Sequence, residues 1–177
     1  AAYMCPILDA LVFRHVAAVR ALAAAMSAAD AHFCLTTPDL RGQNVVHAYA
    51  ATPASGLARL LLRAATGAAA NATLSPDWKA AFRHLGVDRK VVTTWLATRA
   101  EPAAAWSLPR RVVDDAAAPF DAAAVVALES LANSTGDSAS MREALASRDN
   151  NGYTPLLLAC AHGREAVVRQ LVAWGAN

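Results

Sequence analysis

The C-terminal stretch, residues 149–177, constrains the fold more than any other part of the chain; it reads DNNGYTPLLLACAHGREAVVRQLVAWGAN. Asp149 to Gly152 are turn-forming residues, and glycine accepts a positive φ without steric cost. Thr154 is a favourable helix N-cap, and Pro155 fits the first helical position, where its missing N–H costs nothing. The sequence therefore predicts a turn followed by a helix that starts at Pro155.

A second helix is predicted over residues 165–173, because Gly163 allows a tight reversal and Gly175 is a typical helix stop. The apolar side chains of this helix are predicted to share one side; they are Val167, Val168, Leu171 and Val172. Two short antiparallel helices cannot bury both of their faces alone. They need neighbours above and below, as in a repeat array.

The whole pattern, D-x-x-G-x-T-P-L-x-x-A-x-x-x-G-x-x-x-V-V-x-x-L-V-x-x-G-A-N, resembles the ankyrin repeat. One departure is Leu157, because the family usually has His after T-P-L and that His hydrogen-bonds within the turn. We therefore expect the turn of this unit to be held more by packing. The resemblance implies a solenoid of stacked helix pairs.

Ankyrin repeats recur about every 33 residues, so we looked for the pattern upstream. If Pro6 is taken as the Thr-Pro proline, Ala10 falls on the inner-helix alanine and Arg14 stands where the last unit has Gly163. The outer-helix positions of this first copy are then Ala18, Val19 and Leu22.

A second copy starts at Asp39, with Gly42 three residues on and His47 at the family's histidine position. Asn44-Val45-Val46 replaces Thr-Pro-Leu, which predicts a weakened turn. Its outer helix would carry Leu57, Leu61 and Leu62.

Two looser copies complete the expected array. Residues 75–100 have a helix start at Ser75-Pro76 and a break at Gly86. Residues 119–131 and 138–147 are predicted as a further pair, with Ser138 as the cap of its second helix.

Residues 101–115 are expected to form an inserted loop, which carries Trp106, Arg110 and Arg111. These residues fit either a docking loop or a tolerated insertion whose tryptophan folds back over the core.

The predicted class is all-α: an ankyrin-type helix-turn-helix solenoid of about five repeats, several of them divergent. Apolar residues make up 56% of the chain and many are alanine, which favours closely packed helices over a sheet. We expect a single array over residues 1–177, with approximate repeats at 1–30, 39–70, 74–100, 116–148 and 149–177 and the inserted loop at 101–115.

The composition gives little support to catalysis or to nucleic-acid binding. A net charge of +2 provides no basic stripe, and no phosphate-binding glycine loop or zinc-ligand spacing is present. The longest alanine-rich stretch, around 15–31, is interrupted by Arg20 and Asp30, so we expect no membrane insertion by this segment. We expect no enzyme activity, no cofactor and no small-molecule substrate.

The three cysteines are scattered and odd in number, so they imply no disulfide framework and favour a reducing, cytoplasmic setting. Both ends of the sequence look truncated, and Trp174 is expected to pack on a following repeat.

The resemblance implies that the partner is another protein, bound on a concave face of turn tips and inner helices. The candidate residues are Arg41, Gln43, Thr52, Arg83, His84, Asn151, Tyr153, Ala161 and His162. Tyr153 and Arg41 stand out because their types often dominate interface energetics. The alternative for each residue is an ordinary solvated tip. For the chain, the alternatives are a regulatory region of a larger enzyme or membrane channel, or a structural spacer.

Overall fold

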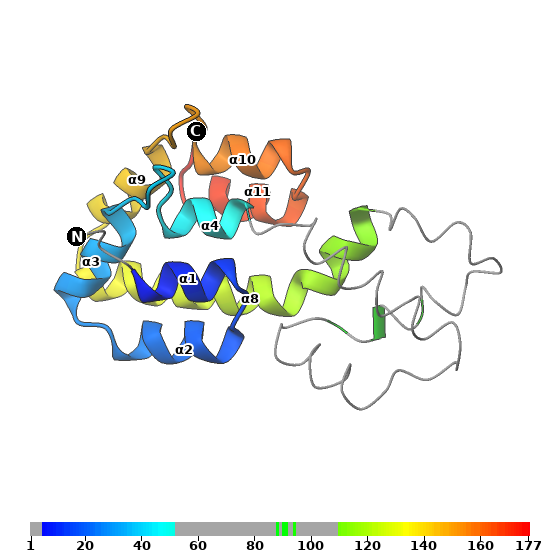
Figure 1. The fold of residues 1–177 in the computed structure, drawn as a ribbon, viewed down its shortest axis with the longest axis horizontal. Coiled ribbons are helices and arrows are strands. Elements are labelled where there is room, and N and C mark those ends of the chain that lie inside the picture. Colours follow the sequence, from blue (N-terminus) through cyan, green and yellow to red (C-terminus); the bar gives the residue numbers. More distant parts are fainter. Residues whose placement is uncertain (1–4, 52–87, 89, 92–93, 95–109) are drawn as a thin grey trace. The chain divides into compact units, whose positions relative to one another are not determined.

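The computed structural model describes residues 5–51, 88, 90–91, 94 and 110–177, and every described element is a helix. The chain divides into two compact units, one of Ala1–Thr52 with Asp121–Asn177 and one of Pro53–Phe120. The helices are α1 (Pro6–Val12), α2 (Val16–Ala25), α3 (Ala28–Thr36), α4 (Val45–Ala51), α8 (Arg110–Thr135), α9 (Ala139–Ala146), α10 (Pro155–Ala161) and α11 (Glu165–Ala173) (Figure 1).

The unit of Pro53–Phe120 is described at few positions. The backbone N–H of Asp88 donates to the carbonyl oxygen of Ala116 at 2.8 Å. Residues 110–115, expected in a loop, are helical because α8 already begins at Arg110, and Pro119 lies inside α8 rather than at a helix start. The predicted outer helix after α4, nearly all of residues 75–100, and Trp106 lie outside the described residues.

The C-terminal helix pair has the predicted form. The Thr154 hydroxyl caps α10 by accepting the N–H of Leu157 at 3.3 Å, and Pro155 is the first helical residue. In α11, Val167 and Leu171 are buried as expected. The prediction for Val172 is wrong, because this side chain lies on the outer side of α11 and is 54% exposed.

The turn between α1 and α2 has the same backbone conformation as the turn between α10 and α11. Arg14 has a φ of 59°, where the last pair has Gly163 at 64°. The N–H of Arg14 donates to Leu11 at 3.1 Å, and that of Gly163 donates to Cys160 at 2.9 Å. A left-handed conformation costs a non-glycine residue about 1–3 kcal/mol, so surrounding contacts must hold Arg14 in place. Its side chain is buried.

Helices α3 and α9 precede two turns of the same form. Helix α3 was not predicted from the sequence, although Ser27 caps it by accepting the N–H of Asp30 at 3.2 Å, a typical N-cap bond. Helix α9 was predicted, but its cap is wrong: Asp137 Oδ1, not the Ser138 hydroxyl, accepts the N–H groups of Ala139 and Ser140. Within this unit α3 packs on α9.

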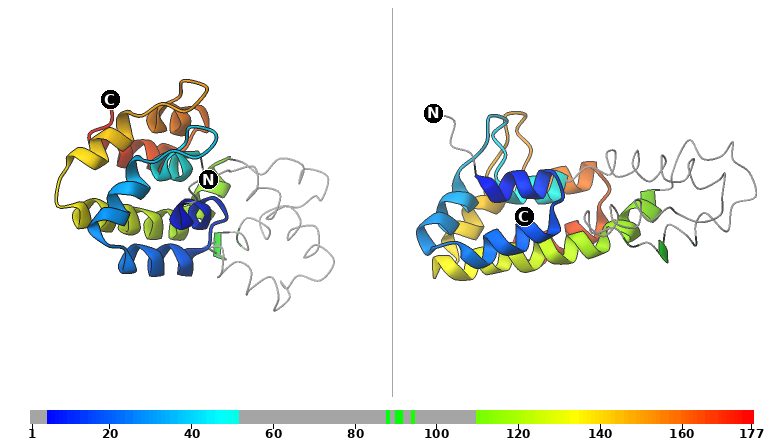
Figure 2. Two further views of the ribbon diagram at one scale, coloured as in Figure 1. Left: turned by 60° about the vertical axis from the view of Figure 1, so that its left-hand side comes forward. Right: turned by 60° about the horizontal axis from the view of Figure 1, so that its bottom comes forward.

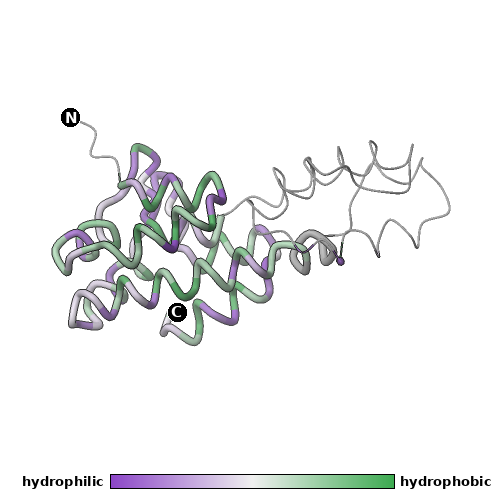
Figure 3. Tube along the Cα trace, turned by 90° about the horizontal axis from the view of Figure 1, so that it is seen from below, coloured by the Kyte–Doolittle hydropathy of each residue, from purple (hydrophilic) through white to green (hydrophobic). Residues whose placement is uncertain are grey.

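Helix α4 lies at the centre of this unit. Helix α4 packs on α1 on one side and on α10 on the other, although α4 and α10 lie more than 100 residues apart in the chain. Figure 2 shows the turn before α4 beside the turn before α10. The hydrophobic segments lie within the helices, and several of the connecting turns are hydrophilic (Figure 3). The largest fully buried side chains of this unit include Ile7, Leu11, Leu35, Tyr49, Leu128, Leu131 and Leu171.

A buried guanidinium joins three of these elements. Arg164, just before α11, is 3% exposed; its Nη1 donates to the carbonyl oxygen of Tyr49 at 2.6 Å and its Nη2 pairs with Asp121 at 2.6 Å. The end of α4 and residue 121 of α8 are therefore held beside each other. Trp174 also packs backward, with its ring 5.9 Å from that of Tyr49 and its Nε1–H donating to Glu129 at 3.1 Å. The packing of Trp174 on a following repeat stays a prediction.

Replacing Arg164 by Met is expected to lower the free energy of unfolding by about 3–5 kcal/mol, because it leaves the Asp121 carboxylate and the Tyr49 carbonyl without their buried partner. Arg169→Met is the matched control. Arg169 pairs with Glu165 on the exposed side of α11, so its loss should cost no more than about 0.5 kcal/mol. Urea unfolding of both variants measures the difference; equal losses would contradict the role given to Arg164.

Candidate protein-interaction surface

The two turns before α4 and α10 have the same internal hydrogen bonds. Asp39 Oδ1 accepts the N–H groups of Arg41 at 2.8 Å and Gln43 at 2.9 Å. Asp149 Oδ1 makes the same two bonds, both at 2.9 Å, to the residues two and four positions later. Gly42 and Gly152 have φ values of 75° and 82°. An aspartate and a positive-φ glycine thus build each turn.

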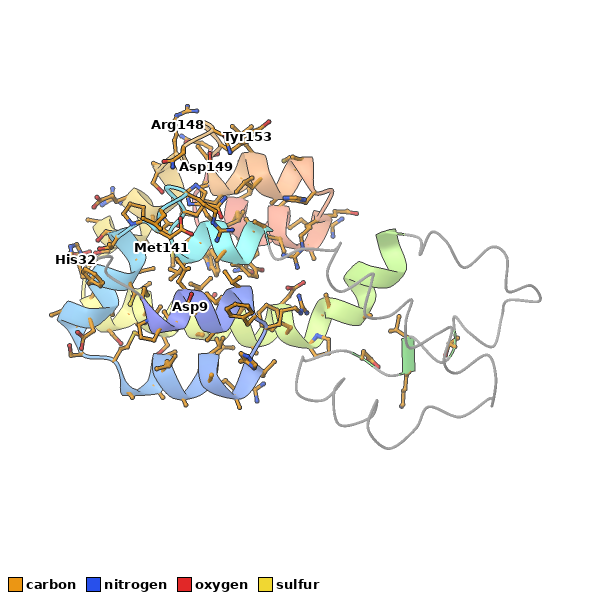
Figure 4. The ribbon with its side chains drawn as sticks, in the orientation of Figure 1. Asp9, His32, Met141, Arg148, Asp149 and Tyr153 are labelled. Carbon is orange, nitrogen blue, oxygen red and sulfur yellow. The ribbon has the colours of Figure 1, made fainter. Side chains whose placement is uncertain are left out.

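The turns are also bonded to each other. The backbone N–H of Asn150 donates to the carbonyl oxygen of Arg41 at 2.9 Å, and its side-chain amide donates to that of Leu40 at 2.9 Å. Gln43 Nε2–H donates to Asp149 at 3.2 Å. Arg148, Asp149 and Tyr153 lie together at this end of the unit (Figure 4). These bonds fix the separation of the two turns.

His47 connects α4 to the second turn. Its side chain is fully buried, and its Nε2 lies 3.0 Å from the carbonyl oxygen of Tyr153, which accepts the Nε2–H. On the other side, Nδ1 lies 2.9 Å from Asn44 Oδ1 and 3.4 Å from the backbone nitrogen of Asn44. His47, which stands at the histidine position of the ankyrin pattern, therefore bridges the two turns.

The turn before α4 is not weakened by the loss of Thr-Pro-Leu, contrary to expectation. Asn44 Oδ1 accepts the N–H groups of Val46 and His47 at 3.0 Å, which caps α4. Asn44 Nδ2 donates to the carbonyl oxygen of Ala144 at 3.0 Å and to the Ser147 hydroxyl at 2.7 Å. One asparagine thus replaces the threonine cap and adds a contact with α9 and the residue that follows it.

Burial lowers the pKa of His47 below its ordinary value, opposed by the hydrogen bond to Tyr153 and the charges of Asp149 and Asp39. For Asp149, burial acts to raise the pKa, but the N–H groups of Tyr153, Gln43 and Asn151 outweigh it and leave the pKa lowered. The structure therefore favours a neutral imidazole beside a charged carboxylate.

Four of the predicted partner-binding residues lie on the two turns. Arg41 is exposed and pairs with Asp39 at 2.9 Å, Asn151 is exposed, and Tyr153 is 44% exposed. Gln43 is half-buried, and its side chain bonds to Asp149. The structure thus brings Arg41, Asn151 and Tyr153 to one exposed edge and gives Gln43 a structural bond.

The other predicted residues lie elsewhere. Ala161 and His162 are at the far end of α10, exposed and half-buried respectively, and the N–H of His162 closes the helix on Leu158 at 2.9 Å. Thr52, Arg83 and His84 lie outside the described residues.

Two exposed leucines lie on or next to these turns. Leu40, at the tip of the first turn, is 88% exposed, and Leu157, in the first turn of α10, is 47% exposed. We expected packing to hold the turn before α10, because the usual histidine is missing there. Instead, Asp149 and His47 hold that turn by hydrogen bonds. We call Leu40, Arg41, Asn151, Tyr153 and Leu157 the turn-tip surface.

Within the described part of the chain, no group of three or more His, Cys, Asp or Glu residues is arranged to hold a metal ion. The described helices also include none that is long and apolar enough to cross a membrane. The cysteines are scattered in the sequence, but the structure brings Cys5 and Cys34 into contact. No sequence signal marks that pair.

Residues 151–177 match the family model of the ankyrin repeat. The C-terminal segment is therefore an ankyrin repeat, and ankyrin repeats are in general modules of protein–protein interaction. No curated protein and no solved structure matches the chain.

Glycine substitutions test whether the turns stack as described. A Cβ at Gly42 would lie 2.6 Å from Asn150 Oδ1 and 2.8 Å from Asn150 N, whereas a Cβ at Gly152 meets nothing within 4 Å. Both residues have positive φ, so both alanine variants carry a strain of about 1–2 kcal/mol. Gly42→Ala should lose about 1–3 kcal/mol more, because the two turns must separate. Equal losses in urea unfolding would show that the turns are not in contact.

His47→Leu is expected to lower the free energy of unfolding by about 1–3 kcal/mol, since it leaves the partly buried Tyr153 carbonyl without its donor. The control is Leu157→His, at the equivalent exposed position, with an effect within about 0.5 kcal/mol.

His47 should also give the protein a pH dependence of stability. Its folded pKa is lowered, so the unfolded chain binds the proton first, and stability should fall as the pH drops below the ordinary value of 6.5. Thermal unfolding between pH 7 and 5 should show this decrease, and His47→Leu should reduce it. An unchanged slope in the variant would contradict a buried neutral His47.

Proposed function

We propose that this protein binds another protein through the turn-tip surface, and that Ala1–Thr52 with Asp121–Asn177 act as one ankyrin-type stack. The observation that carries this proposal is the pair of interlocked turns, whose backbones are fixed by mutual hydrogen bonds while Leu40 and Tyr153 remain exposed. A rigid surface loses little conformational entropy on binding. The stack would act in the cytoplasm.

Membership of α1 and α2 in this stack is supported by hydrogen bonds that match those of the C-terminal repeat. In both pairs the residue after the left-handed position closes the turn with a bond five residues back: His15 to Ala10 at 2.9 Å and Arg164 to Ala159 at 3.0 Å. The turn before α4 matches that of the repeat in the same way, which supports a second, interrupted unit there.

The chemistry of the surface indicates a partner with both apolar and polar groups. Leu40, Tyr153 and Leu157 offer apolar contact, and aromatic residues are frequent energetic centres of interfaces. Arg41 and Asn151 supply polar groups at the same edge. The Arg41 guanidinium is already paired with Asp39, so we expect it to contribute less than Tyr153.

A photo-crosslinking amino acid placed at residue 153 tests the proposal, with the same group at residue 20, an exposed position of α2, as the control. In extracts of the source cells, residue 153 should link to a defined protein that residue 20 does not reach. With that protein purified, Tyr153→Ala should weaken binding by about 30-fold or more, the effect of an interface centre. Arg20→Ala should leave the affinity unchanged. Equal losses for both variants, or crosslinks from residue 20 alone, would overturn the proposed surface.

A further inference from the structure

Cys5 and Cys34 lie 29 positions apart in the chain and meet in the interior, with their sulfur atoms 2.7 Å apart. Cys5 is the residue directly before α1, and Cys34 is in α3; they are 7% and 3% exposed. Both are in the thiol form. The sulfurs of a disulfide are about 2.05 Å apart, so a small movement suffices to bond them.

We propose that Cys5 and Cys34 form an oxidative modification site, at which hydrogen peroxide converts the two thiols into an intramolecular disulfide. Peroxide is small enough to reach buried sulfur atoms when the structure opens locally. A bulky electrophile should favour Cys160, the exposed third cysteine.

Cys5 is the nucleophile in this reaction. The hydrogen bond with Cys34 lowers the pKa of Cys5 to about 7; burial and Asp9 oppose this shift, and the N–H groups of Leu8 and Ile7 reinforce it. The same hydrogen bond and burial raise the pKa of Cys34. Cys5 therefore supplies the thiolate, and Cys34 keeps its proton.

The steps balance as a two-electron oxidation. The Cys5 thiolate attacks one peroxide oxygen, the O–O bond breaks, and the leaving hydroxide takes a proton to give water and a sulfenic acid. The Cys34 sulfur then attacks the Cys5 sulfur, and the departing hydroxyl leaves as a second water with the Cys34 proton. Two thiols and one peroxide thus give one disulfide and two waters.

The bond would fasten the start of α1 to α3 and enclose α2 between them. Closing this loop removes freedom from the unfolded chain, which predicts a melting temperature higher by about 5–10 °C. Oxidation would therefore stabilise the helix pair at the N-terminal end of the unit without touching the turn-tip surface.

The experiment uses the full chain with Cys160→Ser, so that only the two buried thiols remain. After peroxide treatment, mass spectrometry should show a monomer that has lost two hydrogens, with Cys5 and Cys34 in one linked peptide. No thiol should react with maleimide after denaturation, the melting temperature should rise, and dithiothreitol should reverse both changes. Adding Cys5→Ser or Cys34→Ser should abolish the link, and with Cys34→Ser the sulfenic acid should accumulate on Cys5.

Proximity in the folded state is tested by repeating the oxidation in urea, where the linked fraction should fall at least ten-fold. This comparison uses Cys160→Ser alone, so it does not depend on whether the serine variants at 5 and 34 fold. Retention of both thiols, sulfenic or sulfinic acids without the link, or equal linking in urea would overturn the proposal.

Discussion

The unit formed by the two ends of the chain depends on hydrogen bonds between turns that are distant in sequence. Asn150 bonds to Leu40 and Arg41, and His47 bonds to Tyr153, across more than 100 positions of chain. The bond of His47 to Tyr153 is partly buried, and leaving a buried polar group unbonded costs about 1–3 kcal/mol. Helices α4 and α10 are too short to be stable alone, so this contact decides whether they form.

The same contact holds the exposed residues of the two turns at a fixed spacing. Asp39 and Asp149 hold the backbone of each turn, and the bonds between turns set their spacing. Arg164 fixes the opposite end of α4 by bonding to Tyr49 and Asp121. The side chains of Leu40 and Tyr153 are not needed for these bonds and remain available to a partner.

The sequence predicted several helix starts and reversals, because these depend on neighbouring residues in the chain. The Thr154 cap follows from the local residues, whereas the start of α1 at Pro6 and the reversal at Arg14 follow from the resemblance of this segment to the last unit. The contact of α4 with α10 could not be predicted. A repeat pattern predicts that units consecutive in the chain pack on each other, and no sequence signal shows that other residues come between these two. The direction of Trp174 and the pairing of Cys5 with Cys34 depend on that same long-range packing. Of the candidate binding residues, sequence placed Arg41, Asn151 and Tyr153 on turn tips, but the bond that occupies Gln43 required the neighbouring turn.

The most direct measurement of the central contact is an NMR nuclear Overhauser experiment on the isotope-labelled chain. Gly42 and the backbone nitrogen of Asn150 lie close enough that a Cβ on the glycine would be 2.8 Å from that nitrogen. Stacked turns should give a strong cross-peak between the Asn150 amide proton and the Gly42 α-protons, and a slowly exchanging Asn150 amide. Absence of that cross-peak, with Asn150 exchanging as fast as a solvent-exposed amide, would contradict this stacking.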